Sequence, residues 1–231
     1  AFVFQGTVRA QNGVALHLNA VDWVNEGLIE ALNGGKLYFQ EAGNNSATTT
    51  SRGTWRNPGT INLAAGTTLT LGGAFSTADI GNWARTGATV ELAGYLPGGL
   101  TLTDYLGTWN FRGGQITGTF DVAAGSTARL IATSTNSYLN ATTLLDPLDM
   151  STGNATVTAL NGLTVNTVQP IGPNALVASA FFNFQGDQTV RTDGGGEFVF
   201  SIAVGNYLGQ KNGGDRLTIG PGVTVRGAFG T

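Results

Sequence analysis

The chain has 231 residues, of which 11% are charged and 36 are glycine, and its formal net charge is −3. An average soluble domain has about 25% charged residues and about 7% glycine, so this chain is poor in charge and rich in turn-forming residues. Its hydrophobic fraction of 41% argues against disorder, and its scattered Lys and Arg argue against nucleic-acid binding, which requires clustered cations.

The first clear elements are two related segments that begin at Trp23 and Trp55. They share Trp, Asn, Gly and Ile at four matched positions: Trp23, Asn25, Gly27 and Ile29 in the first copy, and Trp55, Asn57, Gly59 and Ile61 in the second. The first copy has helical propensity, but Pro58 in the second copy would break a helix. We therefore predict a corner between two strands in both copies, and we take the matched residues as structural repeat positions.

Short strands follow in the second copy. Thr60–Leu63 and Thr67–Leu71 carry apolar residues at alternate positions, which is typical of strands with one buried face. Residues 57–59, 64–66 and 72–73 contain Gly, Pro or Asn and are predicted corners.

Later segments repeat this plan less strictly. A third copy begins at Trp109, and further short strands are predicted in residues 87–92, 162–166 and 217–225. The irregular spacing of the copies indicates a solenoid whose corners carry insertions of variable length. We expect such insertions at Glu41–Ser51, Asn136–Thr143 and Val168–Asn174.

The chain is therefore predicted to be all-β, a β-solenoid of roughly ten short coils of about 20–25 residues each. No stretch looks like a linker, so residues 1–231 are predicted to form a single solenoid segment. No run of 18 apolar residues is present, and we predict no membrane span.

The repeated motifs resemble those of a known class of proteins. G-T-W-x-N-x-G-T-I, A-G-T-T-L-T-L-G-G, F-Q-G-x-Q-T-V and L-T-I-G-x-G-V-T-V-R-G are similar to repeats of very large secreted bacterial proteins of the filamentous-haemagglutinin and autotransporter-passenger type. The resemblance implies a right-handed parallel β-helix that forms a structural or adhesive segment of an extracellular fibre at the bacterial cell surface. It transfers no catalytic motif to this chain.

The two ends of the chain are also related in sequence. The segment from Phe4 to Arg9 resembles the segment from Phe184 to Arg191, and Thr224-Val-Arg repeats the ending. We expect the chain to be part of a longer tandem array or a protomer that stacks end to end. The expected partners are further coils of the same chain or identical copies, and cell-surface or matrix polysaccharide is an additional candidate.

Few residues of the sequence are candidates for catalysis or metal binding. His17 is the only histidine, it alternates with apolar neighbours and is predicted to point outward, and cysteine is absent. This argues against histidine triads, zinc clusters and cysteine nucleophiles. Two sets of carboxylates are candidates for glycoside hydrolysis: Asp146 and Asp149, and Asp187, Asp193, Glu197 and Asp215. We interpret them as solvated turn residues and predict no catalytic or cofactor-binding residue. The alternative is a β-helix polysaccharide-degrading enzyme or a tailspike-like carbohydrate-binding module.

Two further interpretations concern calcium and the tryptophans. Asp193-Gly-Gly-Gly-Glu and Gly213-Gly-Asp-Arg resemble fragments of a calcium-binding roll, which requires consecutive copies, so no metal ligand is predicted and calcium stays an alternative. Trp23, Trp55 and Trp109 stand at repeat positions, which favours a stacked structural role over a strip for carbohydrate.

Overall fold

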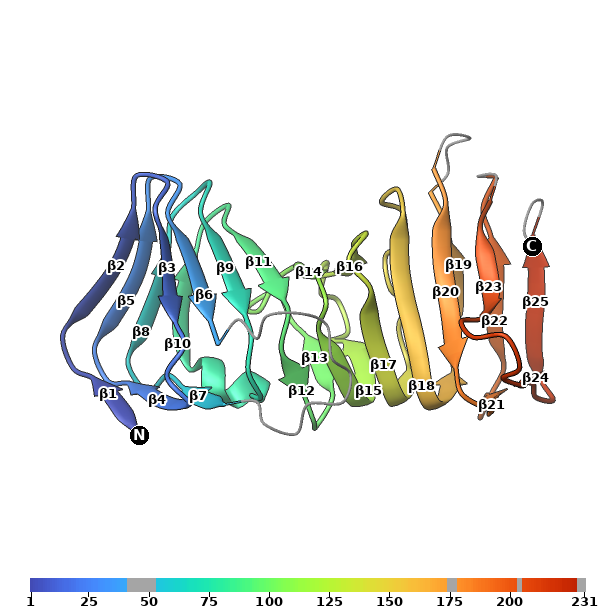
Figure 1. The fold of residues 1–231 in the computed structure, drawn as a ribbon. Coiled ribbons are helices and arrows are strands. Elements are labelled where there is room, and N and C mark those ends of the chain that lie inside the picture. The colour runs from blue at the N-terminus through green and yellow to red at the C-terminus, as the bar shows by residue number, and fades with distance from the viewer. Residues whose placement is uncertain (41–52, 174–177, 203–204, 228–231) are drawn as a thin grey trace. The chain divides into compact units, whose positions relative to one another are not determined.

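The computed structural model describes residues 1–40, 53–173, 178–202 and 205–227. The chain divides into two compact units, Ala1–Pro97 and Gly98–Thr231. Both are built from short parallel strands stacked as a β-solenoid, with about 9 turns in all (Figure 1). The predicted fold class is confirmed. Among the described residues no helix has the length and apolar character to cross a membrane.

The first unit has three parallel sheets, and successive turns add one strand to each. They are β1-β4-β7, β2-β5-β8-β10 and β3-β6-β9-β11. The elements are β1 (Phe2–Phe4), β2 (Thr7–Gln11), β3 (Ala15–Leu18), β4 (Asp22–Asn25), β5 (Leu28–Leu32), β6 (Lys36–Phe39), β7 (Thr54–Arg56), β8 (Thr60–Leu63), β9 (Thr68–Leu71), the 3-10 turn η1 (Thr77–Ile80), β10 (Asn82–Arg85), β11 (Thr89–Leu92) and β12 (Tyr95–Leu96).

The second unit has longer strands and a less regular outline. Its main sheet contains β15-β17-β18-β20-β23, a second sheet is β19-β22-β25, and β14 pairs with β16. The strands are β13 (Leu100–Leu102), β14 (Trp109–Phe111), β15 (Gln115–Val122), β16 (Leu130–Ala132), β17 (Ser137–Leu144), β18 (Ala155–Val165), β19 (Val168–Ile171), β20 (Ala180–Gln185), β21 (Gln188–Arg191), β22 (Gly196–Phe200), β23 (Tyr207–Gln210), β24 (Leu217–Ile219) and β25 (Val223–Gly227).

The segment that begins at Trp23 confirms the predicted strand, corner and strand. β4 ends at Asn25, and β5 begins at Leu28. A Cβ atom on Gly27 would overlap the carbonyl of Gly6 in the preceding coil. Glycine is therefore needed here because the backbones of adjacent coils meet too closely for a side chain.

The core consists of columns of like residues from successive coils. Trp23 lies in register with Trp55, and their rings stack with centroids 5.6 Å apart. Ile29 is paired with Ile61, and both are fully buried. Such columns follow from parallel in-register pairing, which places equivalent side chains on the same face of neighbouring strands.

A buried amide ladder crosses the corners of the first unit. The Asn25 Nδ2 donates to the Asn57 Oδ1 at 2.5 Å, and the Asn57 Nδ2 donates to the carbonyls of Ile80 at 2.7 Å and Asn82 at 3.0 Å. Both asparagines are buried. Each amide therefore satisfies backbone groups at a corner, where the strand ladder is interrupted.

Two of the three expected insertions are wrong. Residues 137–144 form β17, which pairs with β15 and with β18, and residues 168–171 form β19, which pairs with β22. Ladder partners override the turn propensity of these Asn-, Thr- and Pro-containing stretches. The positive φ of Ala141, 49°, accommodates a register shift inside β17.

The number of residues between matched positions of adjacent coils locates the third insertion. Cross-coil contacts join residues 21 apart early in the chain, such as Arg9 and Glu30, but 32 apart for Asn25 and Asn57. The additional residues fall between β6 and β7. The predicted insertion, Glu41–Ser51, lies there and outside the described residues.

The buried amide ladder provides a test of the fold. We expect Asn57→Ala to lower the free energy of unfolding by about 2–3 kcal/mol, because it removes the donor to the carbonyls of Ile80 and Asn82 and the buried oxygen that accepts from the Asn25 amide. Chemical denaturation measures this change. Asn62→Ala, at an exposed position of β8, is the matched control and should change stability by less than about 0.5 kcal/mol. Equal effects of the two substitutions would contradict the ladder.

Candidate functional site

The second unit contains a cleft of about 430 Å³ near the start of the β19-β22-β25 sheet. Its wall combines charged and apolar side chains. Its lining includes Arg129, Asp146, Leu148, Asp149, Met150 and Pro170. Leu148 and Met150 are buried, whereas Asp146 and Asp149 are partly exposed. A concave surface with a few polar groups on an apolar floor is the usual form of a small-ligand site.

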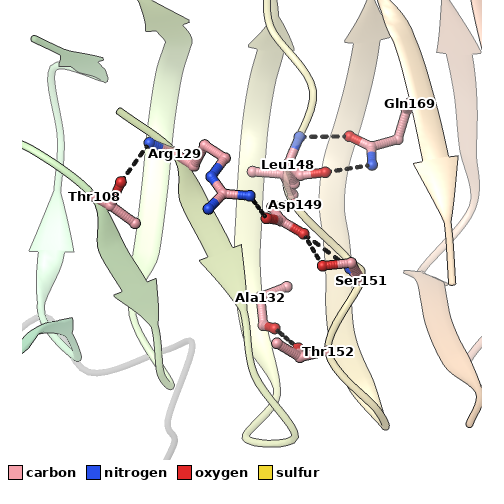
Figure 2. A network of polar contacts seen from close by, with 8 residues as sticks. All are labelled: Thr108, Arg129, Ala132, Leu148, Asp149, Ser151, Thr152 and Gln169. Carbon is pink, nitrogen blue, oxygen red and sulfur yellow. Dashed lines mark hydrogen bonds and ion pairs between the residues drawn. The ribbon is translucent and has the colours of Figure 1, made fainter. Parts of the chain in front are cut away.

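One side of the cleft is held by an ion pair between neighbouring coils (Figure 2). The Arg129 Nη1 lies 3.0 Å from the Asp149 Oδ2. The other carboxylate oxygen, Oδ1, accepts from the backbone N–H of Ser151 at 3.0 Å and from its hydroxyl at 2.5 Å. Both oxygens of Asp149 therefore have partners within the protein, and its carboxylate is fixed in place.

A glutamine side chain takes the place of a backbone ladder beside the cleft. The buried Gln169 accepts from the Leu148 N–H at 2.9 Å and donates to the Leu148 carbonyl at 3.1 Å (Figure 2). Pro170, the next residue of β19, has no N–H to donate. The amide thus satisfies both backbone groups of Leu148.

Two carboxyl groups from adjacent coils meet next to the cleft. Asp121 lies in β15, and burial is the first cause that raises its pKa. Hydrogen bonding to Asp146 and the charge of that carboxylate raise the pKa of Asp121 further, whereas a bond from the Val122 backbone lowers it. Val122 also donates its N–H to the Asp146 Oδ2 at 2.9 Å. Such a pair can share one proton and is the only acid–base candidate that we identify in the described part of the chain.

The two carboxylates of the first predicted pair lie together at the cleft, whereas those of the second set do not line it and contact neighbouring coils instead. Asp146 and Asp149 both line the cleft. In the second set each carboxylate has a partner from a neighbouring coil: the Asp187 Oδ1 accepts from the Arg216 N–H, the Asp215 Oδ2 from the Gly186 N–H, the Asp193 Oδ2 from the Asn166 amide, and Glu197 pairs with Arg226.

His17 and the tryptophans occupy structural environments. His17 points outward from β3 as predicted, and its ring stacks on Tyr38 with centroids 4.5 Å apart. Trp55 lies between Trp23 and Phe75, and all three rings are buried. They also line a second cleft, of about 490 Å³, in the first unit. Trp109 is fully buried and lies in register with Leu130.

The described residues contain no cluster of ligands that would support the calcium alternative. Within the ranges that the structure describes, no three His, Cys, Asp or Glu residues gather in a way that could hold a metal ion. The two glycine-rich fragments instead form corners, in which the Asp193 backbone N–H donates to Asn166 and the Asp215 backbone N–H to the Asn212 carbonyl.

Sequence reasoning missed Asp121, Arg129 and Gln169. Their partners lie one coil away: 20 residues separate Arg129 from Asp149, and 21 separate Gln169 from Leu148. A search for complementary charges at the coil period would have found Arg129 and Asp149, but not Gln169, which binds the backbone of an apolar residue. Asp121 has the weaker signal, because its strand contains no other charged residue.

Comparisons with protein-family models, with curated proteins and with solved structures find no significant match.

The paired carboxyls predict a pH dependence. Because the folded-state pKa of Asp121 is raised, its stabilising contribution is complete below its unfolded pKa, about 3.9, and is lost as the pH rises through the folded value. We expect Asp121→Asn, which can still donate to Asp146, to become increasingly stabilising relative to the wild type as the pH rises from about 4 to 7. Urea unfolding across this range measures the difference.

Asp104→Asn is the control, for which we expect stability to depend on pH in the opposite direction. The Ser126 hydroxyl and the Thr127 N–H lower the pKa of Asp104, so its contribution is present above its unfolded pKa and is lost as the pH falls through the folded value. This variant should be less stable than the wild type at neutral pH. If Asp121→Asn behaves in the same way, the carboxyl pair does not raise the pKa of Asp121.

Proposed function

We propose that this protein is a rigid structural and adhesive segment of an extracellular fibre at the bacterial cell surface, and that it acts without catalysis. The observation that carries the proposal is the register of the coils. Each coil pairs in parallel with the next and places like residues on like residues, as with Trp23 on Trp55 and Ile29 on Ile61. A solenoid of this kind provides length and stiffness from backbone hydrogen bonds and a continuous core.

The polar surface supports this proposal, because its charges connect coils. Arg9 pairs with Glu30 at 2.5 Å, Arg129 with Asp149 at 3.0 Å, and Arg226 with Glu197. Each pair joins neighbouring coils with opposite charges. In-register stacking of like charges would be repulsive, which accounts for the low charge content of the sequence.

Labelling of intact cells tests the proposal. Antibodies raised against residues 1–231 should label unpermeabilised cells of the source bacterium and the fibres sheared from them. The label should be lost when surface protease is applied before staining. Labelling that requires permeabilisation would overturn the location. A surface label that lies on the cell envelope and never on extended fibres would overturn the structural role.

The cleft favours one second candidate, a module that binds or cleaves polysaccharide. Asp121 and Asp146 form a carboxyl pair beside a cavity of a size suited to a small sugar. A hydrolase would release reducing ends from a polysaccharide panel, and Asp146→Asn would reduce this release by at least about a hundredfold. Asp187→Asn, at a corner, is the control that should keep the activity. No release from any polymer, with a folded protein, would exclude this candidate hydrolase for the panel.

A further inference from the structure

The peptide bond between Asp146 and Pro147 lies at the cleft of the second unit, and it is the only Asp-Pro bond in the sequence. Both residues line the cleft; Asp146 is partly exposed and Pro147 is exposed. The nitrogen of a bond to proline belongs to a tertiary amide, which carries no N–H. Such a nitrogen is more basic than that of an ordinary peptide bond and leaves more readily once it is protonated. The sequence therefore places an aspartate carboxyl beside a peptide bond that it can attack.

The backbone is held on both sides of this bond. The Leu145 N–H donates to a carbonyl of β15 at 3.0 Å. Beyond the bond, both backbone groups of Leu148 are bonded to the Gln169 side chain, at 2.9 and 3.1 Å (Figure 2). The ring of Pro147 fixes its own φ and restricts Asp146 to extended conformations. The carbonyl and the carboxyl of Asp146 are thus held within a narrow range of conformations at a cleft that water can enter.

The Asp146 carboxylate is oriented by the neighbouring coil and has a second carboxyl group beside it. The Val122 N–H donates to the Asp146 Oδ2 at 2.9 Å, and Asp121 precedes Val122 in β15. Burial and hydrogen bonding to Asp146 raise the pKa of Asp121. Asp121 therefore keeps its proton at pH values at which an ordinary aspartate, with a pKa of about 3.9, is ionised. A carboxylate nucleophile and a proton donor lie next to each other at this bond.

The other charged groups around the cleft have partners of their own. Arg129 and Asp149 pair with each other at 3.0 Å. In the preceding coil, the Asp104 Oδ1 accepts from the Ser126 hydroxyl at 2.8 Å and from the Thr127 N–H at 3.0 Å. Asp146 is thus the charged group that acts most directly on the Asp121 proton.

We propose that the folded chain cleaves itself between Asp146 and Pro147, with the Asp146 carboxylate as nucleophile and Asp121 as proton donor. A side-chain oxygen of Asp146 forms a bond to the backbone carbonyl carbon of the same residue, and the bond from this carbon to the Pro147 nitrogen breaks. The nitrogen keeps the electron pair and takes the proton from Asp121. The products of this step are a five-membered cyclic anhydride at Asp146 and a free secondary amine at Pro147.

Water from the cleft completes the reaction. Its oxygen adds to the anhydride and opens it to two carboxyl groups, the side chain and the new C-terminus of Asp146. One proton returns to Asp121, so the net change is the hydrolysis of one peptide bond by one water molecule. Each chain reacts once and no other substrate is turned over, so this activity goes beyond the proposed structural function without depending on it.

The fold holds the two fragments together after the cut. β17 precedes the bond and β18 follows it, and these strands pair in parallel from Ser137 on Val157 to Leu144 on Val165. Cleavage breaks the chain between them and leaves their backbone ladder in place. Denaturing conditions are therefore needed to separate and detect the fragments.

Incubation of the purified full chain at about pH 5 tests the proposal, because ordinary aspartates are ionised at this pH. Denaturing electrophoresis and mass spectrometry should show two fragments, residues 1–146 and residues 147–231. The cleavage should be first-order, with a rate constant independent of protein concentration, because it is intramolecular. The folded chain should react at least about tenfold faster than the same chain unfolded in urea at the same pH, since unfolding removes Asp121 from the bond.

Three substitutions assign the roles of the residues. Asp121→Asn removes the proton donor and should slow cleavage at least about tenfold. Pro147→Ala replaces the tertiary amide with an ordinary peptide bond and should abolish cleavage at this position. Asp187→Asn, which removes a carboxylate at a distant corner, is the matched control and should react at the wild-type rate. Circular dichroism checks that each variant is folded at the pH of the assay.

Several results would overturn the proposal. A folded wild type that is cleaved no faster than the unfolded chain would show that the fold does not promote the reaction. Unchanged cleavage of a folded Asp121→Asn variant would remove Asp121 from the mechanism. A rate constant that rises with protein concentration would indicate cleavage by another molecule. None of these results depends on where the protein is located in the cell, so each would leave the proposed structural function intact.

Discussion

Parallel in-register pairing of adjacent coils is the constraint on which the rest of this structure depends. Strands about 4.8 Å apart place each residue directly over its counterpart in the previous coil. Apolar positions therefore become continuous columns, such as Leu37 on Leu69 and Leu69 on Val90. Corners must repeat as well, and glycine is required where backbones approach too closely for a Cβ atom, as at Gly27 and Gly59. In-register pairing thus gives a regular repeat in space, although the sequence repeats only approximately.

The same constraint explains where the polar chemistry lies. At regular positions, charges pair across coils and contribute to the connection between them, as Arg9 does with Glu30. Beside Pro170 the Gln169 amide replaces a strand-to-strand ladder, and the cleft opens at this place. The Asp121 and Asp146 pair lies next to it. This carboxyl pair is therefore associated with a local departure from the regular coil.

The dependence of each coil on its neighbours follows from the same physics. A solenoid coil is complete only when it has a neighbour on each side, because half of its backbone groups and part of its core face along the axis. Val190 and Ile219 illustrate this, since they occupy equivalent positions and differ in whether a further coil covers them.

The sequence by itself determined the all-β solenoid, the strand and corner order around Trp23 and Trp55, and the outward position of His17. These depend on local alternation and on short repeats, which are visible along the chain. Only the tertiary structure decided that Ser137–Leu144 and Val168–Ile171 are strands, because their conformation depends on partners about 20 residues or more away. It also decided that the neighbours of Asp146 include Asp121, whose pKa it raises from one coil away. Register between coils sets these contacts, and register depends on the number of residues in each intervening corner.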